Sequence, residues 1–407
     1  MIEMADVNVL KERVRGEVDA LMPRLVEMSD WIGKHPELGS EEYESSRLLA
    51  EELKKHGFKV EMGVQGMPTA FKAVMKGKGR GPTIAFLCEY DALPGVGHGC
   101  GHNMIGTSGL GAGIAVSKLM KGLPGELWVV GTPAEEGHGP SSSAKKKMAE
   151  AGLFEGVDAV MMMHPMGNSK ATVATGFLAT NGIRIEYMGR TAHAAADPQN
   201  GLNALNAAVL CFMAVHANRQ QLRRDANPVV HGIITEGGLA SNIIPDRAAL
   251  QFGVRSSDDT YIPTLVKMVE NSARGAAIAT GCDVKITVNP GLKSNVRNPP
   301  LERLFVKAYK ELGIEAEDPD YTAAQPPGGS TDFTDLSHFV PGMHTMLGFT
   351  KADITGHSRE LCAATLTEEG HRGIEIGAKV LAIAGVEVLT DAKLRAEISE
   401  AFDRAKK

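Results

Sequence analysis

Apolar residues recur along this chain with two different spacings, and each spacing predicts a type of element. Between residues 9 and 31 they fall three or four positions apart, which places them on one face of a helix. They are Leu10, Val14, Val18, Leu21, Leu25, Met28 and Trp31. A second helix is predicted at about 41–56, followed by a strand near 57–62.

Four short apolar runs further along are followed by polar, chemically reactive residues. The runs lie in TIAFLCEYDALP, ELWVVGTPAEEGHG, VDAVMMMHP and GMHTMLGFT. The polar residues that follow them are Glu89, Asp91, Glu135, Glu136, His164 and His357. Helical stretches at 107–120 and 141–152 alternate with these strands, which predicts an α/β domain with a mostly parallel sheet and helices on both faces. Ligands bind at the carboxyl ends of such strands, so we expect these side chains to converge there.

The pattern changes between about 180 and 293. Alternating strands are predicted in GIRIEYMGR, VVHGIITEGG, RAALQFGVRSS and DVKITVNPG, with helices at 200–224 and 260–280. The order β-α-β-β-α-β is that of a ferredoxin-like α+β domain. The sequence therefore predicts one domain of residues 1–179 and 294–407, interrupted by a second domain of residues 180–293.

Composition narrows the class of protein. The chain has 407 residues, of which 43% are apolar, and this composition is typical of a soluble globular protein. Its net charge is −6 and it has no basic block, which argues against nucleic acid as its main partner. The sequence shows neither a signal-like segment nor an uncharged apolar stretch of about 18 residues, so we do not expect a membrane span. The cysteines are few, odd in number and scattered, so we expect a reducing compartment, the cytoplasm. They are Cys88, Cys100, Cys211, Cys282 and Cys362.

The stretch GVGHGCGHNMIG, residues 95–106, places histidines and a cysteine among glycines. Thiolate, imidazole and carboxylate together suit zinc or a neighbouring divalent transition metal. Cys-x-His alone is weak evidence, because a glycine-rich turn with solvated histidines has the same sequence. Delivery of ligand types by four separate strand ends favours a metal site. The candidate ligands are Cys100, His102, Glu136, His164 and His357.

Three other patterns carry competing interpretations. Of two adjacent glutamates, one can hold a metal while the other takes a proton from water, although an acidic pair also begins many helices. The run GTSGLGAGIA lacks dinucleotide-binding spacing and follows a loop, so close packing of a helix on the sheet is favoured. Met161, Met162 and Met163 are interpreted as the buried part of a strand.

At this point several motifs resemble a known family in their order and spacing. They are KHPELGSEE, EYDALPGVGHGCGHN, TPAEEGHG, MMHP, GRTAHAAADPQNGLNA and SNIIPDRA. Together they resemble the aminoacylase and glutamate-carboxypeptidase family of metallopeptidases, in its amidohydrolase branch, from about residue 10 to 390. Within that branch the sequence is similar to p-aminobenzoyl-glutamate hydrolase subunits and to β-alanyl-lysine or Xaa-Arg dipeptidases.

The resemblance implies two divalent metal ions per subunit, zinc, manganese or cobalt, held by the five candidate ligands. Cys100 stands where related enzymes have a bridging carboxylate, and Glu135 takes the position of the general base. Asp91 is expected to orient His102. The family's inserted domain is a lid that forms a homodimer, in which His193 reaches the partner's active site and stabilises the oxyanion with help from Asn242.

The resemblance also implies a subsite for the substrate. Arg255 stands where relatives bind the substrate carboxylate, and Gly329 and Ser330 line the pocket. Two positions depart from the family pattern. Asn103 replaces an aspartate, and Glu89 replaces the first residue of His-x-Asp, so no ligand role is carried onto Glu89.

We therefore expect metal-dependent hydrolysis of the amide bond of a dipeptide or N-acyl amino acid. One alternative is a subunit of a two-chain p-aminobenzoyl-glutamate hydrolase, and another is a non-catalytic metal-binding scaffold. Retention of every expected ligand, the base and the lid histidine argues against the scaffold. The acyl half of the substrate and the native metal stay open.

Overall fold

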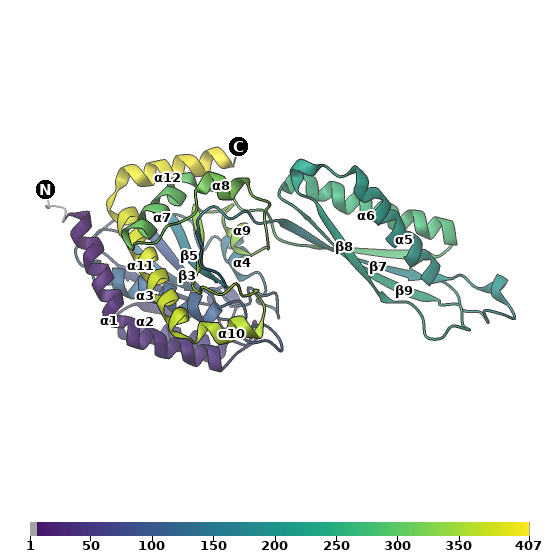
Figure 1. Cartoon of the computed structure of the whole chain (residues 1–407), viewed down its shortest axis with the longest axis horizontal. Helices are drawn as coiled ribbons and strands as arrows, with labels where there is room; N and C mark the ends of the chain where they lie inside the picture. Colours follow the sequence, from purple (N-terminus) through teal and green to yellow (C-terminus); the bar gives the residue numbers. More distant parts are fainter. Residues whose placement is uncertain (1–5, 407) are drawn as a thin grey trace. The chain divides into compact units, whose positions relative to one another are not determined.

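The computed structural model describes residues 6–406 and divides into two compact units (Figure 1). Unit 1 comprises the described residues up to Thr175, Val296–Gln325 and the described residues from Asp335 onward. Unit 2 comprises Gly176–Asn295 and Pro326–Thr334. The predicted domain ends at residues 1 and 407 lie outside the described residues. Within residues 6–406, no helix combines the length and the apolarity that a bilayer crossing needs.

A seven-stranded mixed sheet forms the centre of unit 1, in the order β1-β2-β4-β3-β5-β11-β6. Its strands are β1 (Lys59–Met62), β2 (Phe71–Lys76), β3 (Thr83–Cys88), β4 (Glu126–Gly131), β5 (Ala159–Met166), β6 (Ala171–Thr172) and β11 (Gly342–Gly348). The four central strands β4, β3, β5 and β11 are parallel, whereas the edge pairings are antiparallel. The predicted α/β class with a mostly parallel sheet is confirmed, and its central strands all end at the same sheet edge.

Helices α1, α3 and α11 pack against one another, and α3 also packs on β3, β4 and β5. The helices of unit 1 are α1 (Val7–Lys34), α2 (Tyr43–Lys55), α3 (His102–Ser117), α4 (Ala144–Glu150), α7 (Pro299–Glu311), α8 (Pro319–Ala324), α10 (Arg359–Thr365), α11 (Glu368–Thr390) and α12 (Ala392–Ala405), and the short helix α9 (Phe333–Leu336) begins in unit 2 and ends in unit 1. All residues of α3 are buried, as expected for a helix that is apolar on every side.

The glycines of α3 allow this helix to approach the sheet closely. A Cβ atom at Gly109 would lie 2.6 Å from the backbone oxygen of Leu87, and one at Gly113 would lie 2.2 Å from a methyl of Val129. Both distances are too short for a side chain. Close packing of a helix on the sheet, the favoured interpretation of the glycine run, is confirmed. The core interpretation of the methionines at 161–163 is confirmed as well, because all three are buried in β5.

Unit 2 is an antiparallel sheet in the order β10-β7-β9-β8, with α5 and α6 packed on each other and on it (Figure 1). Its elements are β7 (Ala179–Met188), α5 (Ala204–Asn218), β8 (Val229–Glu236), β9 (Arg247–Ser256), α6 (Ile262–Thr280) and β10 (Asp283–Pro290). This is the ferredoxin-like arrangement. Helix α5 is shorter than the predicted 200–224: the Asn203 side chain caps its start, and short turns replace its polar end.

The segment Pro326–Thr334 belongs to unit 2, whereas the sequence pattern predicts it in the first domain. The Leu178 N–H donates to the Gly329 carbonyl at 3.2 Å, and the Ser330 hydroxyl donates to the Leu178 carbonyl at 3.0 Å. The Arg255 guanidinium donates to the same hydroxyl at 3.3 Å. These bonds join residues far apart in the chain, which local hydrophobic patterns do not reveal.

Candidate metal centre

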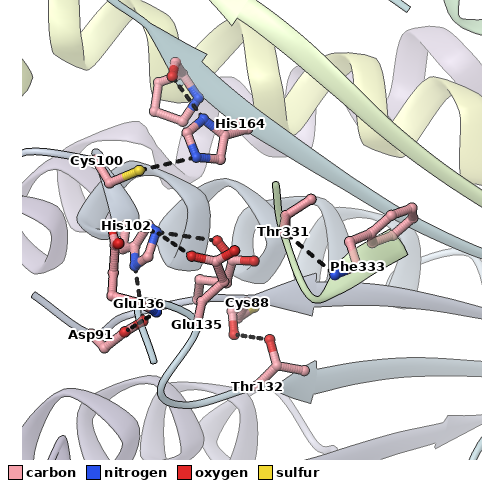
Figure 2. A network of polar contacts seen from close by, with 12 residues as sticks. Cys88, Asp91, Cys100, His102, Thr132, Glu135, Glu136, His164, Thr331 and Phe333 are labelled. Atoms are coloured by element: carbon pink, nitrogen blue, oxygen red, sulfur yellow. Dashed lines mark hydrogen bonds and ion pairs between the residues drawn. The ribbon is translucent and has the colours of Figure 1, made fainter. Parts of the chain in front are cut away.

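Polar side chains converge at the carboxyl edge of the parallel strands in unit 1 (Figure 2). Asp91 follows the end of β3, Glu135 and Glu136 follow the end of β4, and His164 lies in β5. The loop after Asp91 returns to the same edge and leads into α3 at His102. The expectation that separate strand ends deliver these residues to one place is therefore met by the fold.

Six of the residues singled out in the sequence fall into three overlapping groups of possible metal ligands. Within each group the ligand atoms lie within 4.8 Å of one another. The groups are Cys100 with His102 and His164, Cys100 with Glu136 and His357, and His102 with Glu135 and Glu136. Cys100 belongs to two of them, so its sulfur adjoins both sides of the cluster.

Two pairs of these atoms connect segments that are far apart in the chain. The sulfur of Cys100 lies 3.3 Å from Nε2 of His164, and Nε2 of His357 lies 3.5 Å from Oε1 of Glu136. His357 is the most exposed of the set, with 59% of its side chain accessible, and its φ of 60° is left-handed. Its backbone N–H donates to the Gly99 carbonyl at 2.8 Å, which ties it to the cysteine loop.

Asp91 holds His102 in one orientation. The Nδ1–H of His102 donates to Oδ1 of Asp91 at 2.9 Å, and the other carboxylate oxygen accepts the Glu136 N–H at 3.0 Å. Burial favours the neutral imidazole, but the charge and hydrogen bond of Asp91 raise the pKa of His102 well above its usual value. Because the proton on Nδ1 is held by Asp91, Nε2 is the nitrogen that faces the cluster and would give up its proton to bind a cation.

A second buried carboxylate, that of Glu42, supports the backbone before the two glutamates. Its oxygens accept the Ala134 N–H at 2.8 Å and the Thr69 hydroxyl at 2.9 Å. Ala134 has a φ of 55°, a left-handed conformation that is unfavourable for alanine. Burial raises the pKa of Glu42 to about 7. Glu42 and Asp91 together hold both ends of the turn that presents Glu135.

The donor set fits a divalent cation. Nε2 of His102 and Oε1 of Glu136 are buried and have no hydrogen-bond partner among the described residues, which is costly without a ligand. Burial lowers the pKa of His164 to about 4, so its imidazole is neutral and has a lone pair to offer. Burial also raises the pKa of the Cys100 thiol to about 12, and a divalent cation would deprotonate such a thiol.

The remaining predicted site residues lie in unit 2. Nδ1 of His193 accepts the N–H groups of Ala195 and Ala196 at 3.2 and 3.1 Å, which leaves the ring proton on Nε2. The Asn242 carbonyl accepts the Ala194 N–H at 3.0 Å, so the two predicted oxyanion residues are neighbours. Both are exposed. Arg255, Gly329 and Ser330 form a separate cluster in the same unit.

Three residues beside the centre have no role in the sequence-based expectation. Oε1 of Glu89 forms an ion pair with Lys145 at 2.7 Å, and both side chains are fully buried. The ring of His344 stacks on His164 with centroids 5.5 Å apart. Glu89 could be noticed from its place two residues before Asp91. Lys145 stands in the run AKKKM, a pattern typical of an exposed basic face, so its neighbours in the chain carry no signal of burial.

The chain is similar to known peptidases and amide hydrolases over most of its length. Residues 85–382 match the family described as peptidase family M20/M25/M40. The human protein named Xaa-Arg dipeptidase is 34% identical over 415 residues, which cover 98% of this chain and 93% of that protein. One of the p-aminobenzoyl-glutamate hydrolase subunits of Escherichia coli is 32% identical over 315 residues, 73% of this chain and 64% of that protein.

Two solved structures share the fold. A dinuclear metal binding peptidase of the M20 family from Bacillus subtilis has a TM-score of 0.69 and 23% identity, over 91% of this chain and 99% of that chain. An aminobenzoyl-glutamate utilization protein from Klebsiella pneumoniae has a TM-score of 0.69 and 19% identity, over 93% of this chain and 99% of that chain. With the match of the family and the cluster of ligand-type side chains, the chain belongs to peptidase family M20/M25/M40 and is a metal-dependent hydrolase of amide bonds.

Proposed function

We propose that this protein hydrolyses the amide bond of a dipeptide, or of an N-acyl amino acid, that ends in a free carboxylate. The observation that carries the proposal is the convergence of Cys100, His102, Glu135 and Glu136 within overlapping ligand groups at one sheet edge. The likeness to a protein named Xaa-Arg dipeptidase over 98% of this chain favours a dipeptide.

Cys100, His102, Glu136, His164 and His357 are the residues that would hold two divalent metal ions, with zinc, manganese and cobalt all suited to the donor set. When bound, such ions polarise the scissile carbonyl and lower the pKa of the attacking water toward about 7. Two features of the chain favour metal binding by these histidines. Asp91 orients the ring of His102, and burial keeps His164 neutral.

Glu135 is the proposed general base. Its carboxylate lies in a ligand group with His102 and Glu136, where it can reach a water molecule at the centre. It takes the proton from the attacking water and then returns it to the leaving nitrogen, which must be protonated before the amine departs. The turn held by Glu42 and Asp91 fixes the direction of this side chain.

Unit 2 contributes the substrate contacts in this proposal. Nε2 of His193 carries a proton, so it can donate to the oxyanion, and the exposed Asn242 amide lies on the neighbouring loop. The Arg255 guanidinium offers a planar pair of donors for the substrate carboxylate, beside Ser330.

A homodimer through unit 2 is part of the proposal. Strand β8 is an edge strand, with open hydrogen-bonding groups along one side. Exposed apolar side chains gather on β8 and α5, a composition that is typical of an interface. They are Val209, Leu210, Met213, Val229, Ile233 and Ile234. All five cysteines are free, which supports the reducing cytoplasm as the location.

One alternative has a specific observation in its favour. The likeness to one of the chains named for a p-aminobenzoyl-glutamate hydrolase allows activity only with a sister chain. Co-purification of a second chain of similar size would support that assignment, whereas turnover by a lone homodimer would exclude it.

The deciding experiment is amine release from a panel of dipeptides and N-acyl amino acids. The panel includes p-aminobenzoyl-glutamate, β-alanyl-lysine and Xaa-Arg dipeptides, with zinc, manganese, cobalt or a chelator added. We expect metal-dependent release, with the preferred substrate naming the branch. Stoichiometric metal binding without turnover of any substrate, alone or with a sister chain, would favour a non-catalytic scaffold.

A further inference from the structure

A buried lysine and a buried glutamate lie directly behind the candidate metal centre. Nζ of Lys145, from α4, is 2.7 Å from Oε1 of Glu89, which follows β3, and neither side chain is accessible to solvent. Removing both charges from water is costly, and a buried ion pair is therefore weak evidence of a role in stability alone. A function that needs a fixed carboxylate at this place would account for the pair.

The second oxygen of Glu89 faces the centre. Oε2 lies 3.4 Å from Nε2 of His102, both atoms are buried, and neither has a hydrogen-bond partner among the described residues. Two atoms that are each about 2.1 Å from a tetrahedral ion lie about 3.4 Å apart. The pairs Cys100–His164 and Glu136–His357, at 3.3 and 3.5 Å, have nearly the same separation.

The position of Lys145 explains why only one oxygen of Glu89 is available. The ammonium group contacts Oε1 and places a positive charge beside the buried carboxylate. Oε2 then lies toward Nε2 of His102, the ring nitrogen that Asp91 does not contact. Without Lys145 the Glu89 carboxylate could rotate, and neither oxygen would be held toward His102.

We propose that Glu89 is a further carboxylate ligand of the metal centre, at the ion held by His102, and that Lys145 is the positioning residue that keeps it there. This inference rests on the proposed metal-dependent function and adds a residue to its centre. It assigns to the Glu89–Lys145 pair the task of retaining one of the ions.

The test is calorimetric titration of zinc into metal-free protein, with chelator competition to measure the affinity of each ion. The variant Glu89→Gln keeps the size of the side chain but turns a neutral amide toward the cation. We expect the affinity for one ion per chain to fall about 10- to 100-fold, while the other ion is retained. If Glu89→Gln does not fold, Glu89→Asp keeps the charge beside Lys145 but withdraws the oxygens from His102, with the same expected direction.

Lys11→Met is the matched control, because it removes a lysine from another buried ion-pair cluster. Lys11 contacts Glu387 and Glu311 at 3.1 and 2.7 Å, and its side chain is 5% exposed. This variant should lower the thermal unfolding temperature without changing zinc affinity. A parallel loss of zinc affinity in Lys11→Met would mean that destabilisation alone weakens the centre, and the proposal would fall.

The role of Lys145 is tested with Lys145→Met and with the double variant Lys145→Met/Glu89→Gln. Because Lys145 acts through Glu89, the double variant should bind zinc no more weakly than Glu89→Gln alone. In the cobalt-substituted protein, both single variants should alter the visible absorption bands, which report the ligand set. Tighter zinc binding in Lys145→Met would show that the lysine merely repels cations, and would overturn its positioning role.

Failure of this inference is distinguishable from failure of the proposed function. If the unsubstituted chain binds zinc and turns over substrate but Glu89→Gln retains full zinc affinity and an unchanged cobalt spectrum, Glu89 is not a ligand and only the inference is lost. If the unsubstituted chain binds no divalent ion at all, the centre itself is rejected together with the inference.

Discussion

The two units present their chemistry in opposite ways. In unit 1, Asp91, His102 and Glu89 are almost fully buried and contact one another through side-chain charges. In unit 2, His193 and Asn242 are exposed on loops and are held through backbone groups. A buried charge must have its partners in place, because water cannot replace them. An exposed donor is free to act on a molecule that arrives later.

This contrast leads to different consequences of substitution. Ligand changes in the buried centre of unit 1 should affect metal retention and activity together, since the same atoms serve both. Changes at the exposed residues of unit 2 should affect turnover or substrate affinity and leave the metal content intact. Four predictions, from the largest expected effect to the smallest, test this division.

Glu135→Ala removes the proposed base. Unlike a change of a metal ligand in unit 1, it should affect activity without affecting metal retention. We expect turnover to fall by about 10²- to 10⁴-fold, because no other group takes its place in proton transfer. Metal content, measured by elemental analysis, should stay unchanged. Glu136→Ala is the matched control and should lose metal as well. Metal loss in Glu135→Ala with retention in Glu136→Ala would mean that the two roles are exchanged.

His193→Ala removes the proposed oxyanion donor of unit 2. Turnover should fall by about 10²- to 10³-fold, with folding and metal content unchanged. If the histidine acts across a dimer, mixing this variant with Glu135→Ala chains should restore part of the activity, since one intact site is reassembled. Absence of recovery in verified mixed dimers would reject action across the dimer. Ile233→Lys, on the edge strand β8, should weaken the dimer, which light scattering measures. The same substitution should reduce the activity recovered by mixing the two variants.

Arg255→Met removes the guanidinium proposed to bind the substrate carboxylate. Losing a charge-assisted pair of hydrogen bonds should raise KM about 10- to 100-fold. The ester or amide of the same substrate, which lacks the charge, should be affected little by the substitution. Steady-state kinetics with both substrates separate the two cases, and an equal loss for charged and neutral substrates would remove Arg255 from carboxylate binding.

Glu42→Gln tests the buried support of the catalytic turn through pH. The pKa of Glu42 is about 7 in the folded protein, above its value of 4.5 in an exposed chain, so folding is favoured by its protonated form. Its contribution to stability is therefore lost as pH rises from about 4.5 to 7. Relative to the variant, the unsubstituted metal-free protein should lose on the order of 2 kcal/mol of unfolding free energy across this range. Parallel denaturant curves at pH 5 and pH 8 measure it, and equal losses in both proteins would contradict the assignment.

Local patterns in the sequence were sufficient for much of the fold. Periodicity identified α1, the central strands and the βαββαβ order of unit 2, because burial of one face sets the spacing of apolar residues. The glycines of α3 indicated close packing, because only they allow a helix to approach β3 and β4 so closely. The candidate ligands could also be named from sequence, because each follows a predicted strand or stands in a distinctive motif.

Only the tertiary structure decided what those residues contact. It paired Lys145 with Glu89, joined Glu42 to the turn at Ala134, and brought Pro326–Thr334 to unit 2. These contacts connect residues that are tens of positions or more apart, and the identity of an isolated lysine or glutamate does not indicate its partner. The sequence determined which elements form and which chemical groups they carry. The packing of those elements determined which groups are buried together, because the energy of a buried charge depends on every neighbour around it.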